Sequence, residues 1–165
     1  MKNPKNKGNA FERCVAKMLS EWAGVKFLRT PSSGAIHNFK DKRVVSDIVP
    51  PLAVGNFPFS IECKNVTCSW EFSSILEGTS VTINKHWNQC CTDAERENLI
   101  PMLVFTKNFH RIFCVLQKSV YDKLNLILES TLTLDRNNQE SLIIFSFQDL
   151  LKAISCEDLI AKKLI

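Results

Sequence analysis

The stretch at residues 59–65, Phe-Ser-Ile-Glu-Cys-Lys-Asn, constrains this chain more than any other. It predicts a short strand, in which successive side chains point to opposite faces. The apolar side chains would then face an interior: Phe59, Ile61 and Cys63. Glu62 and Lys64 would share the other face with Ser60. Burying an acid and a base costs desolvation free energy, so this pair needs a structural or chemical reason.

A second carboxylate lies in an apolar run shortly before this strand. Residues 44–49, Val-Val-Ser-Asp-Ile-Val, predict a strand that ends at two prolines. The apolar residues of this run lie on both sides of Asp47, so its carboxylate must be paired, hydrogen-bonded or bound to a metal ion. The connection at 50–58 is of suitable length for antiparallel pairing with the strand at 59–65. That pairing would bring Asp47 beside Glu62.

Two carboxylates held close together repel each other, which raises one pKa or recruits a cation. Mg²⁺ fits this position because it prefers oxygen ligands and keeps several waters and substrate phosphate in its shell. We therefore expect a metal-dependent nuclease site, with Glu62 as a metal ligand and Lys64 as a stabiliser of negative charge. A simple buried ion pair between Glu62 and Lys64 is the alternative.

The first helix is expected over residues 9–23, followed by Gly24 as a stop. Its apolar residues recur at three- and four-residue spacing: Phe11, Val15, Met18, Leu19 and Trp22. Glu12 lies at the edge of this apolar face and could approach Glu62. Glu12 also stands three residues after Asn9, which is the spacing of a capping box. Both interpretations stay open.

The remaining pattern indicates one α/β domain over residues 1–165, with no internal repeat. The expected elements are a short strand at 25–30, a helix at 82–98, strands at 102–105 and 112–116, a strand near 141–145, and helices near 120–128, 147–154 and 156–164. Three Ser/Asp pairs with capping-box spacing support the last helices: Ser119 with Asp122, Ser146 with Asp149, and Ser155 with Asp158.

Basic residues concentrate at the start of this chain of net charge +4. A one-ended basic surface suits a phosphate backbone, although a solvated face explains the charge alone equally well. The candidate DNA-binding residues are Lys5, Lys7, Arg13, Arg29, Lys40, Lys42 and Arg43. No apolar run approaches the ~20 residues of a membrane span, so we expect a cytoplasmic protein without a membrane partner. The seven cysteines form no C-x-x-C pair, which argues against a zinc ribbon.

The order of these features resembles the PD-(D/E)xK nuclease superfamily, and within it the archaeal-type Holliday junction resolvases and their phage relatives. The resemblance covers residues 7–116. It rests on a helix with Glu12, the loop Arg29-Thr30-Pro31-Ser32-Ser33-Gly34, a strand with Asp47, a strand with Glu62-Cys63-Lys64, and a helix with Gln89. Ser46 stands where the motif's name expects proline.

This resemblance implies a restriction-endonuclease-like core at 7–116, with a central mixed sheet flanked by helices, and a C-terminal helical extension at 117–165. It implies that Asp47, Glu62 and the Cys63 carbonyl bind Mg²⁺, with Mn²⁺ as a substitute, and that Glu12 completes or neighbours the metal shell. Lys64 would stabilise the phosphate, and Gln89 would lie near the active site. A loop serine, Ser32 or Ser33, would assist cleavage, and Ser33 is also a candidate DNA contact.

The implied activity is cleavage of branched DNA by a homodimer, in the host cytoplasm if the protein is phage-encoded. A restriction-like or repair nuclease on duplex DNA is a second reading, and a non-cleaving DNA-binding module of the same fold is a third. The three histidines, His37, His86 and His110, lie outside the motif and are expected to be structural or surface residues.

Overall fold

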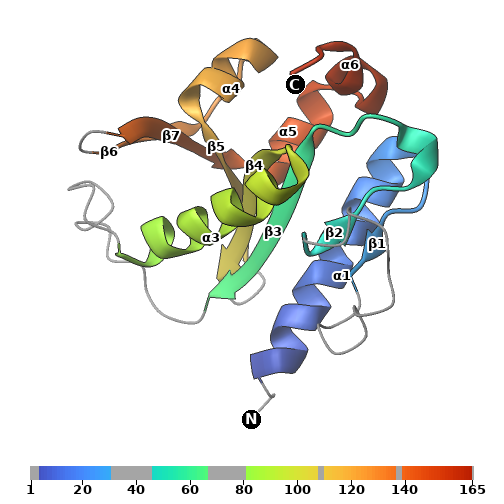
Figure 1. Cartoon of the computed structure of the whole chain (residues 1–165), viewed down its shortest axis with the longest axis horizontal. Coiled ribbons are helices and arrows are strands. Elements are labelled where there is room, and N and C mark those ends of the chain that lie inside the picture. The colour runs from blue at the N-terminus through green and yellow to red at the C-terminus, as the bar shows by residue number, and fades with distance from the viewer. Residues whose placement is uncertain (1–3, 31–45, 67–80, 108–109, 137–138, 165) are drawn as a thin grey trace.

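A five-stranded mixed sheet forms the centre of the protein (Figure 1). The computed structural model describes residues 4–30, 46–66, 81–107, 110–136 and 139–164. In spatial order the strands are β3 (Phe59–Val66), β4 (Ile100–Lys107), β5 (Ile112–Gln117), β7 (Gln139–Ser146) and β6 (Thr131–Arg136). β3 and β4 pair in parallel, and the other neighbours pair antiparallel. The expected α/β class with a mixed sheet is confirmed.

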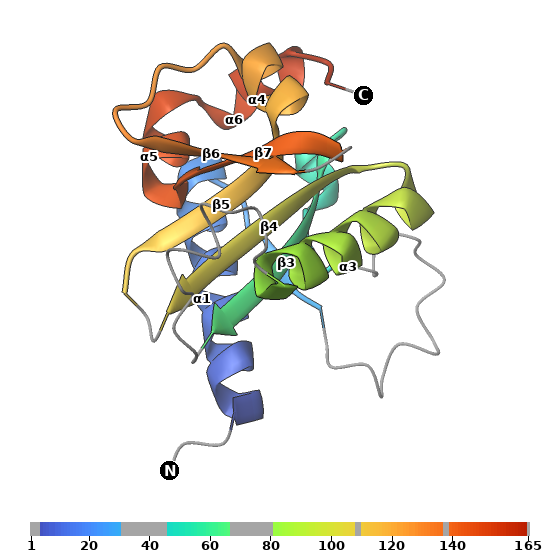
Figure 2. The same cartoon turned by 90° about the vertical axis from the view of Figure 1, so that its left-hand side faces the viewer.

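Helices cover both faces of this sheet (Figure 2). On one face lies α1 (Pro4–Ala23), together with α4 (Lys118–Leu124), α5 (Phe147–Ala153) and α6 (Cys156–Ala161). On the other face lies α3 (Val81–Glu97). The indole N–H of Trp22 donates to the Ile154 carbonyl at 2.8 Å and ties α1 to the C-terminal helices.

The alternation along β3 produces two separate apolar cores. Phe59, Ile61 and Cys63 pack against the buried side of α1. The opposite face of the sheet packs against Trp87 and Cys90 of α3. Glu62 also lies on that opposite face and is 5% exposed. The predicted alternation of this strand is therefore confirmed, and both of its faces are covered by helices.

The expected pairing of residues 44–49 with 59–65 was wrong as a strand ladder. β2 (Ile48–Val49) instead pairs antiparallel with β1 (Leu28–Arg29) in a separate two-stranded sheet. β3 takes β4 as its neighbour, because a parallel partner can be reached through the long crossover that contains α3. A single backbone bond still joins the two regions, since the Asp47 N–H donates to the Ile61 carbonyl at 3.0 Å. The connection that follows β2 contains a short 3₁₀ turn, η3 (Leu52–Val54).

The C-terminal part supplies the three predicted helices and also two strands that continue the sheet. The strand expected near 141–145 is β7, whereas β6 was not predicted. Ser146 and Ser155 cap α5 and α6 as expected. The cap assigned to Ser119 was wrong, because α4 begins at Lys118 and its N-cap position is Gln117.

Candidate active site

The exposed edge of β3 is the centre of the candidate site, because β3 is the end strand of the five-stranded sheet. The N–H and C=O of one strand residue point to the same edge, and this edge alternates along the strand. Asp47 bonds to this edge twice: its N–H donates to the Ile61 carbonyl, and its Oδ2 accepts from the Cys63 N–H at 2.8 Å. The Cys63 carbonyl therefore points to the same edge as the Asp47 carboxylate.

Glu62 is held by two side chains on the α3 face of the sheet. The ammonium of Lys64 forms an ion pair with Glu62 Oε1. Gln89 of α3 donates through Nε2 to the same oxygen at 3.0 Å. Within the described part of the chain, Oε2 of Glu62 receives no hydrogen bond. The ion pair expected as an alternative is present, and the carboxylate keeps an oxygen for a further ligand.

Negative charge accumulates around Asp47. Burial, followed by the charge of Glu62, raises the pKa of Asp47 from 3.8 to about 7, although the Cys63 N–H opposes this shift. The charge of Glu12 also raises the Asp47 pKa. Burial lowers the pKa of Lys64, but its hydrogen bond to Glu62 and the nearby carboxylates outweigh burial, so the net shift is upward. Lys64 therefore stays protonated beside the nearby carboxylates.

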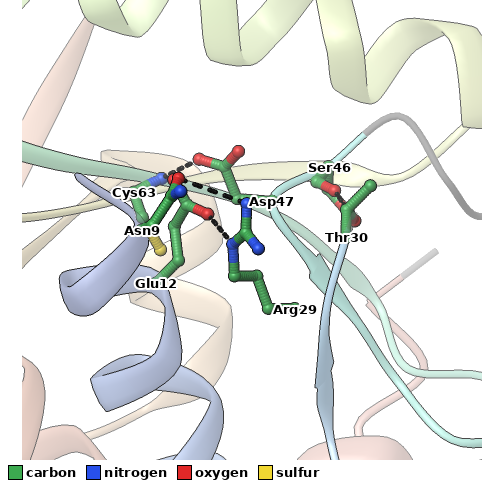
Figure 3. A network of polar contacts seen from close by, with 7 residues as sticks. All are labelled: Asn9, Glu12, Arg29, Thr30, Ser46, Asp47 and Cys63. Atoms are coloured by element: carbon green, nitrogen blue, oxygen red, sulfur yellow. Dashed lines mark hydrogen bonds and ion pairs between the residues drawn. The ribbon is translucent and has the colours of Figure 1, made fainter. Parts of the chain in front are cut away.

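Glu12 lies near this cluster on α1 and forms an ion pair with Arg29 (Figure 3). The guanidinium Nε of Arg29 forms an ion pair with Glu12 Oε2, and its Nη2 donates to Asn9 Oδ1 at 3.2 Å. The capping-box reading of Asn9 and Glu12 was wrong, because α1 begins at Pro4 and Asn9 lies within the helix. Glu12 thus belongs to the polar network around Asp47.

Thr30 and Ser46 fix the backbone of Asp47, and sequence reasoning did not single out Thr30. The Thr30 N–H donates to the Asp47 carbonyl at 2.9 Å, and its hydroxyl donates to the Ser46 carbonyl at 2.5 Å (Figure 3). The Ser46 hydroxyl donates to the Ile48 carbonyl at 2.9 Å. Proline has no hydroxyl, so Ser46 adds a side-chain bond that the proline of the motif's name could not make.

The donor set can be tested against a divalent cation. Among the described residues, no group of three His, Cys, Asp or Glu side chains lies close enough to hold a metal ion by itself. Mg²⁺ needs only one or two carboxylates, because waters and substrate phosphate complete its octahedral shell. Asp47, Glu62 and the Cys63 carbonyl meet that need with oxygen atoms. Burial and the nearby carboxylates raise the pKa of the Cys63 thiol, so this sulfur stays protonated and is a poor ligand.

The other predicted site residues are distributed around or beyond this cluster. Arg13 is exposed on α1, and Lys7 is half-buried there. The predictions that fall outside the described side chains are Lys5, Ser32, Ser33, His37, Lys40, Lys42 and Arg43. His86 lies one turn before Gln89 on α3, and burial, then the charges of Lys64 and Lys85, lower its pKa. His86 is therefore neutral near pH 7.

Comparisons with known proteins identify the family of the chain. A family model described as "Phage putative PDDEXK endonuclease" matches residues 3–161. Protein D14 of Escherichia phage T5 is 29% identical over 160 residues, covering 94% of this chain and 96% of that protein. No solved structure matches the chain significantly. None of the helices in the described residues is both long and apolar enough to cross a bilayer.

Proposed function

The chain belongs to the family of phage PDDEXK endonucleases, within the PD-(D/E)xK nuclease superfamily, and from this premise we propose that it cleaves branched DNA with Mg²⁺. Nucleases of this superfamily act on DNA and use divalent metal ions. The observation that carries the proposal is a pair of carboxylates at β3, Asp47 at the open edge and Glu62 on the α3 face, with Lys64 beside Glu62. The metal identity, the branched substrate and the homodimer are the proposed parts.

In the proposed mechanism Asp47, Glu62 and the Cys63 carbonyl would hold Mg²⁺, for which Mn²⁺ could substitute. When bound, the divalent ion neutralises the phosphodiester and lowers the pKa of an attacking water. Lys64 supplies a fixed positive charge where negative charge develops on the phosphate. Its ion pair with Glu62 keeps the ammonium within the site before DNA arrives.

Two further groups position these residues. Gln89 holds Glu62 through Oε1, which leaves the other oxygen free to point toward the edge of β3. Arg29 neutralises Glu12, so Glu12 does not add an uncompensated negative charge beside Asp47. Glu12 would neighbour the metal shell in this arrangement, or enter it if Arg29 turns toward DNA phosphate. Ser32 or Ser33 would assist at the scissile phosphate.

The basic N-terminal residues would hold the DNA backbone around this site. They are Lys5, Lys7, Arg13, Arg29, Lys40, Lys42 and Arg43. Among the described positions, Arg29 contacts Glu12 directly, and Arg13 follows Glu12 on α1. A homodimer would present two such sites, which suits the two-fold symmetry of a four-way junction.

Cleavage of a substrate panel tests the proposal. Four-way junctions, linear duplex and single strands of the same sequence are incubated with the protein and Mg²⁺ or Ca²⁺. The mass of the protein in solution is measured separately to give its oligomeric state. Paired, symmetric cuts in junctions by a dimer are expected. Equal cutting of linear duplex would overturn the branched-DNA assignment and favour a restriction-like or repair nuclease. Binding to all substrates without cleavage would favour a non-cleaving module.

A further inference from the structure

A basic groove lies between α1 and β1, next to the candidate active site. Its volume is about 540 Å³. It is lined by Arg13, Ala16, Lys17, Ser20, Glu21, Lys26, Phe27, Leu28 and Arg29. Four of these side chains are basic and one is acidic, so the groove carries a net positive charge. Neither Lys17 nor Lys26 takes part in the cluster around Asp47.

The groove continues from the active site. Arg29 lines the groove and also contacts Glu12, whose charge acts on Asp47. Arg13 and Lys17 are one helical turn apart, which separates them by about 6 Å along α1. A chain of positive charge therefore leads away from the carboxylates along one side of α1.

The walls of this groove are held at a fixed separation. The Ser20 hydroxyl donates to the Ala16 carbonyl at 2.6 Å and accepts from the Phe27 N–H at 2.9 Å. Phe27 is 3% exposed, so the segment before β1 is anchored in the core. Leu28 is 52% exposed at the groove and offers apolar surface beside the basic side chains. A fixed basic groove can bind a polyanion without first ordering its walls, which removes an entropic cost of binding.

The lysines of the groove are available to a ligand. The Lys17 ammonium lies 3.6 Å from Glu21, with side chains 77% and 67% exposed respectively, and such surface pairs contribute little free energy. Lys26 is exposed. Phosphates can therefore replace Glu21 as the partner of Lys17 with release of condensed counterions from the DNA.

We propose that this groove binds the DNA backbone on one side of the scissile phosphate through Lys17 and Lys26. The inference rests on the proposed function, because it places the groove on the path of the cleaved strand. It adds two phosphate-binding residues and an acid, Glu21, that limits affinity. Leu28 would contact the sugars between the phosphates.

Binding of a junction and of duplex DNA, measured by fluorescence anisotropy with EDTA over a salt series, tests this proposal. The double variant Lys17→Ala/Lys26→Ala is expected to weaken binding roughly tenfold and to reduce the slope of log affinity against log salt by about 2. Glu21→Gln is expected to strengthen binding, which no folding defect would produce.

Matched controls lie on α4, where Lys118 pairs with Asp122 at i,i+4 as Lys17 pairs with Glu21. Lys118→Ala/Lys123→Ala and Asp122→Asn make the same charge changes outside the groove and are expected to leave the salt slope unchanged. If both double lysine variants weaken DNA binding equally, the groove is not a specific site, and the net charge of the protein explains the binding.

Cleavage by the unmodified protein, measured in parallel, separates this inference from the proposed function. Cleavage together with binding that does not depend on Lys17 and Lys26 would overturn the groove alone. Binding that depends on both lysines, without cleavage under any metal condition, would overturn the nuclease proposal and keep the groove.

Discussion

The carboxylate of Asp47 accepts a hydrogen bond from the backbone N–H of Cys63, at 2.8 Å, at the open edge of β3. This bond fixes Asp47 beside the strand that also carries Glu62 and Lys64. Because of this bond, the Glu62–Lys64 ion pair has a second carboxylate beside it, and two carboxylates suit a divalent cation. The bond also only partly offsets the burial and repulsion that raise the Asp47 pKa to about 7.

The raised pKa predicts a pH dependence of stability in the metal-free protein. An acid whose pKa is higher in the folded state stabilises fully below its unfolded pKa of 3.8, and this contribution is lost as pH rises through about 7. Asp47→Asn keeps an oxygen that can accept from Cys63 but removes the charge. With EDTA at pH 8, the variant is expected to be more stable by roughly 2 kcal/mol, or about 5 °C in Tm.

At pH 4 the difference in Tm between Asp47→Asn and the unmodified protein is expected to shrink. Asp122→Asn, on the exposed face of α4, is the charge-matched control and should change the Tm little at either pH. An Asp47→Asn variant that is no more stable than the unmodified protein at pH 8 would contradict the electrostatic strain assigned to Asp47.

Gln89→Ala tests the support of Glu62 by α3. Loss of the 3.0 Å bond frees the Glu62 carboxylate to turn, and removal of a residue that orients a metal ligand costs about 10–100-fold in activity or metal affinity. Single-turnover cleavage and Mn²⁺ titration measure the two effects. Asn88→Ala, at an exposed position of the same turn, is the control, and an equal loss in both variants would argue against a specific role for Gln89.

The Arg29–Glu12 ion pair predicts that substitutions of the two residues have coupled effects on stability. Arg29→Gln leaves the Glu12 carboxylate, 16% exposed, without this charged partner and should destabilise the protein, whereas the double variant with Glu12→Gln should recover part of the loss. A double-mutant cycle from chemical denaturation is expected to give a coupling free energy of about 1–2 kcal/mol. Additive effects would show that the pair contributes no net coupling.

Thr30→Val removes the hydroxyl that donates to the Ser46 carbonyl while it keeps the side-chain volume. Thr30 is 9% exposed, so the unsatisfied carbonyl should cost about 1 kcal/mol of unfolding free energy. The shift of the Asp47 backbone should also slow cleavage. Thr133→Val makes the same substitution at an exposed position of β6 and is the control, which should leave the cleavage rate unchanged.

The local chemistry of the site could be predicted because it follows from strand alternation. Glu62 and Lys64 share a face, and Phe59 and Ile61 face the core, as period two requires. The placement of Gln89 near Glu62 came from the family resemblance. The capping-box spacing of Asn9 and Glu12 gave a wrong helix start, because the helix begins at Pro4, before Asn9.

Long-range pairing could not be predicted from the same patterns. Whether β3 takes β2 or β4 as its neighbour depends on tertiary packing of α3, which the short apolar runs do not encode. β6 escaped prediction because Leu132 and Leu134 are its only apolar residues and it ends in the charged pair Asp135 and Arg136. The hydrogen bonds of Thr30 likewise require the fold, since its partner Ser46 lies 16 positions further along the sequence.

Metal-dependent cleavage by variants of the two carboxylates tests the central claim most directly. Single-turnover cleavage of a four-way junction with Mg²⁺ would be compared for the unmodified protein, Asp47→Asn, Glu62→Gln and the control Asp122→Asn, with binding of the same junction measured in EDTA. We expect both site variants to lose at least about 100-fold in rate while they bind the junction, and the control to cut normally. Cleavage that persists in both site variants would contradict the assignment of Asp47 and Glu62 as the active site.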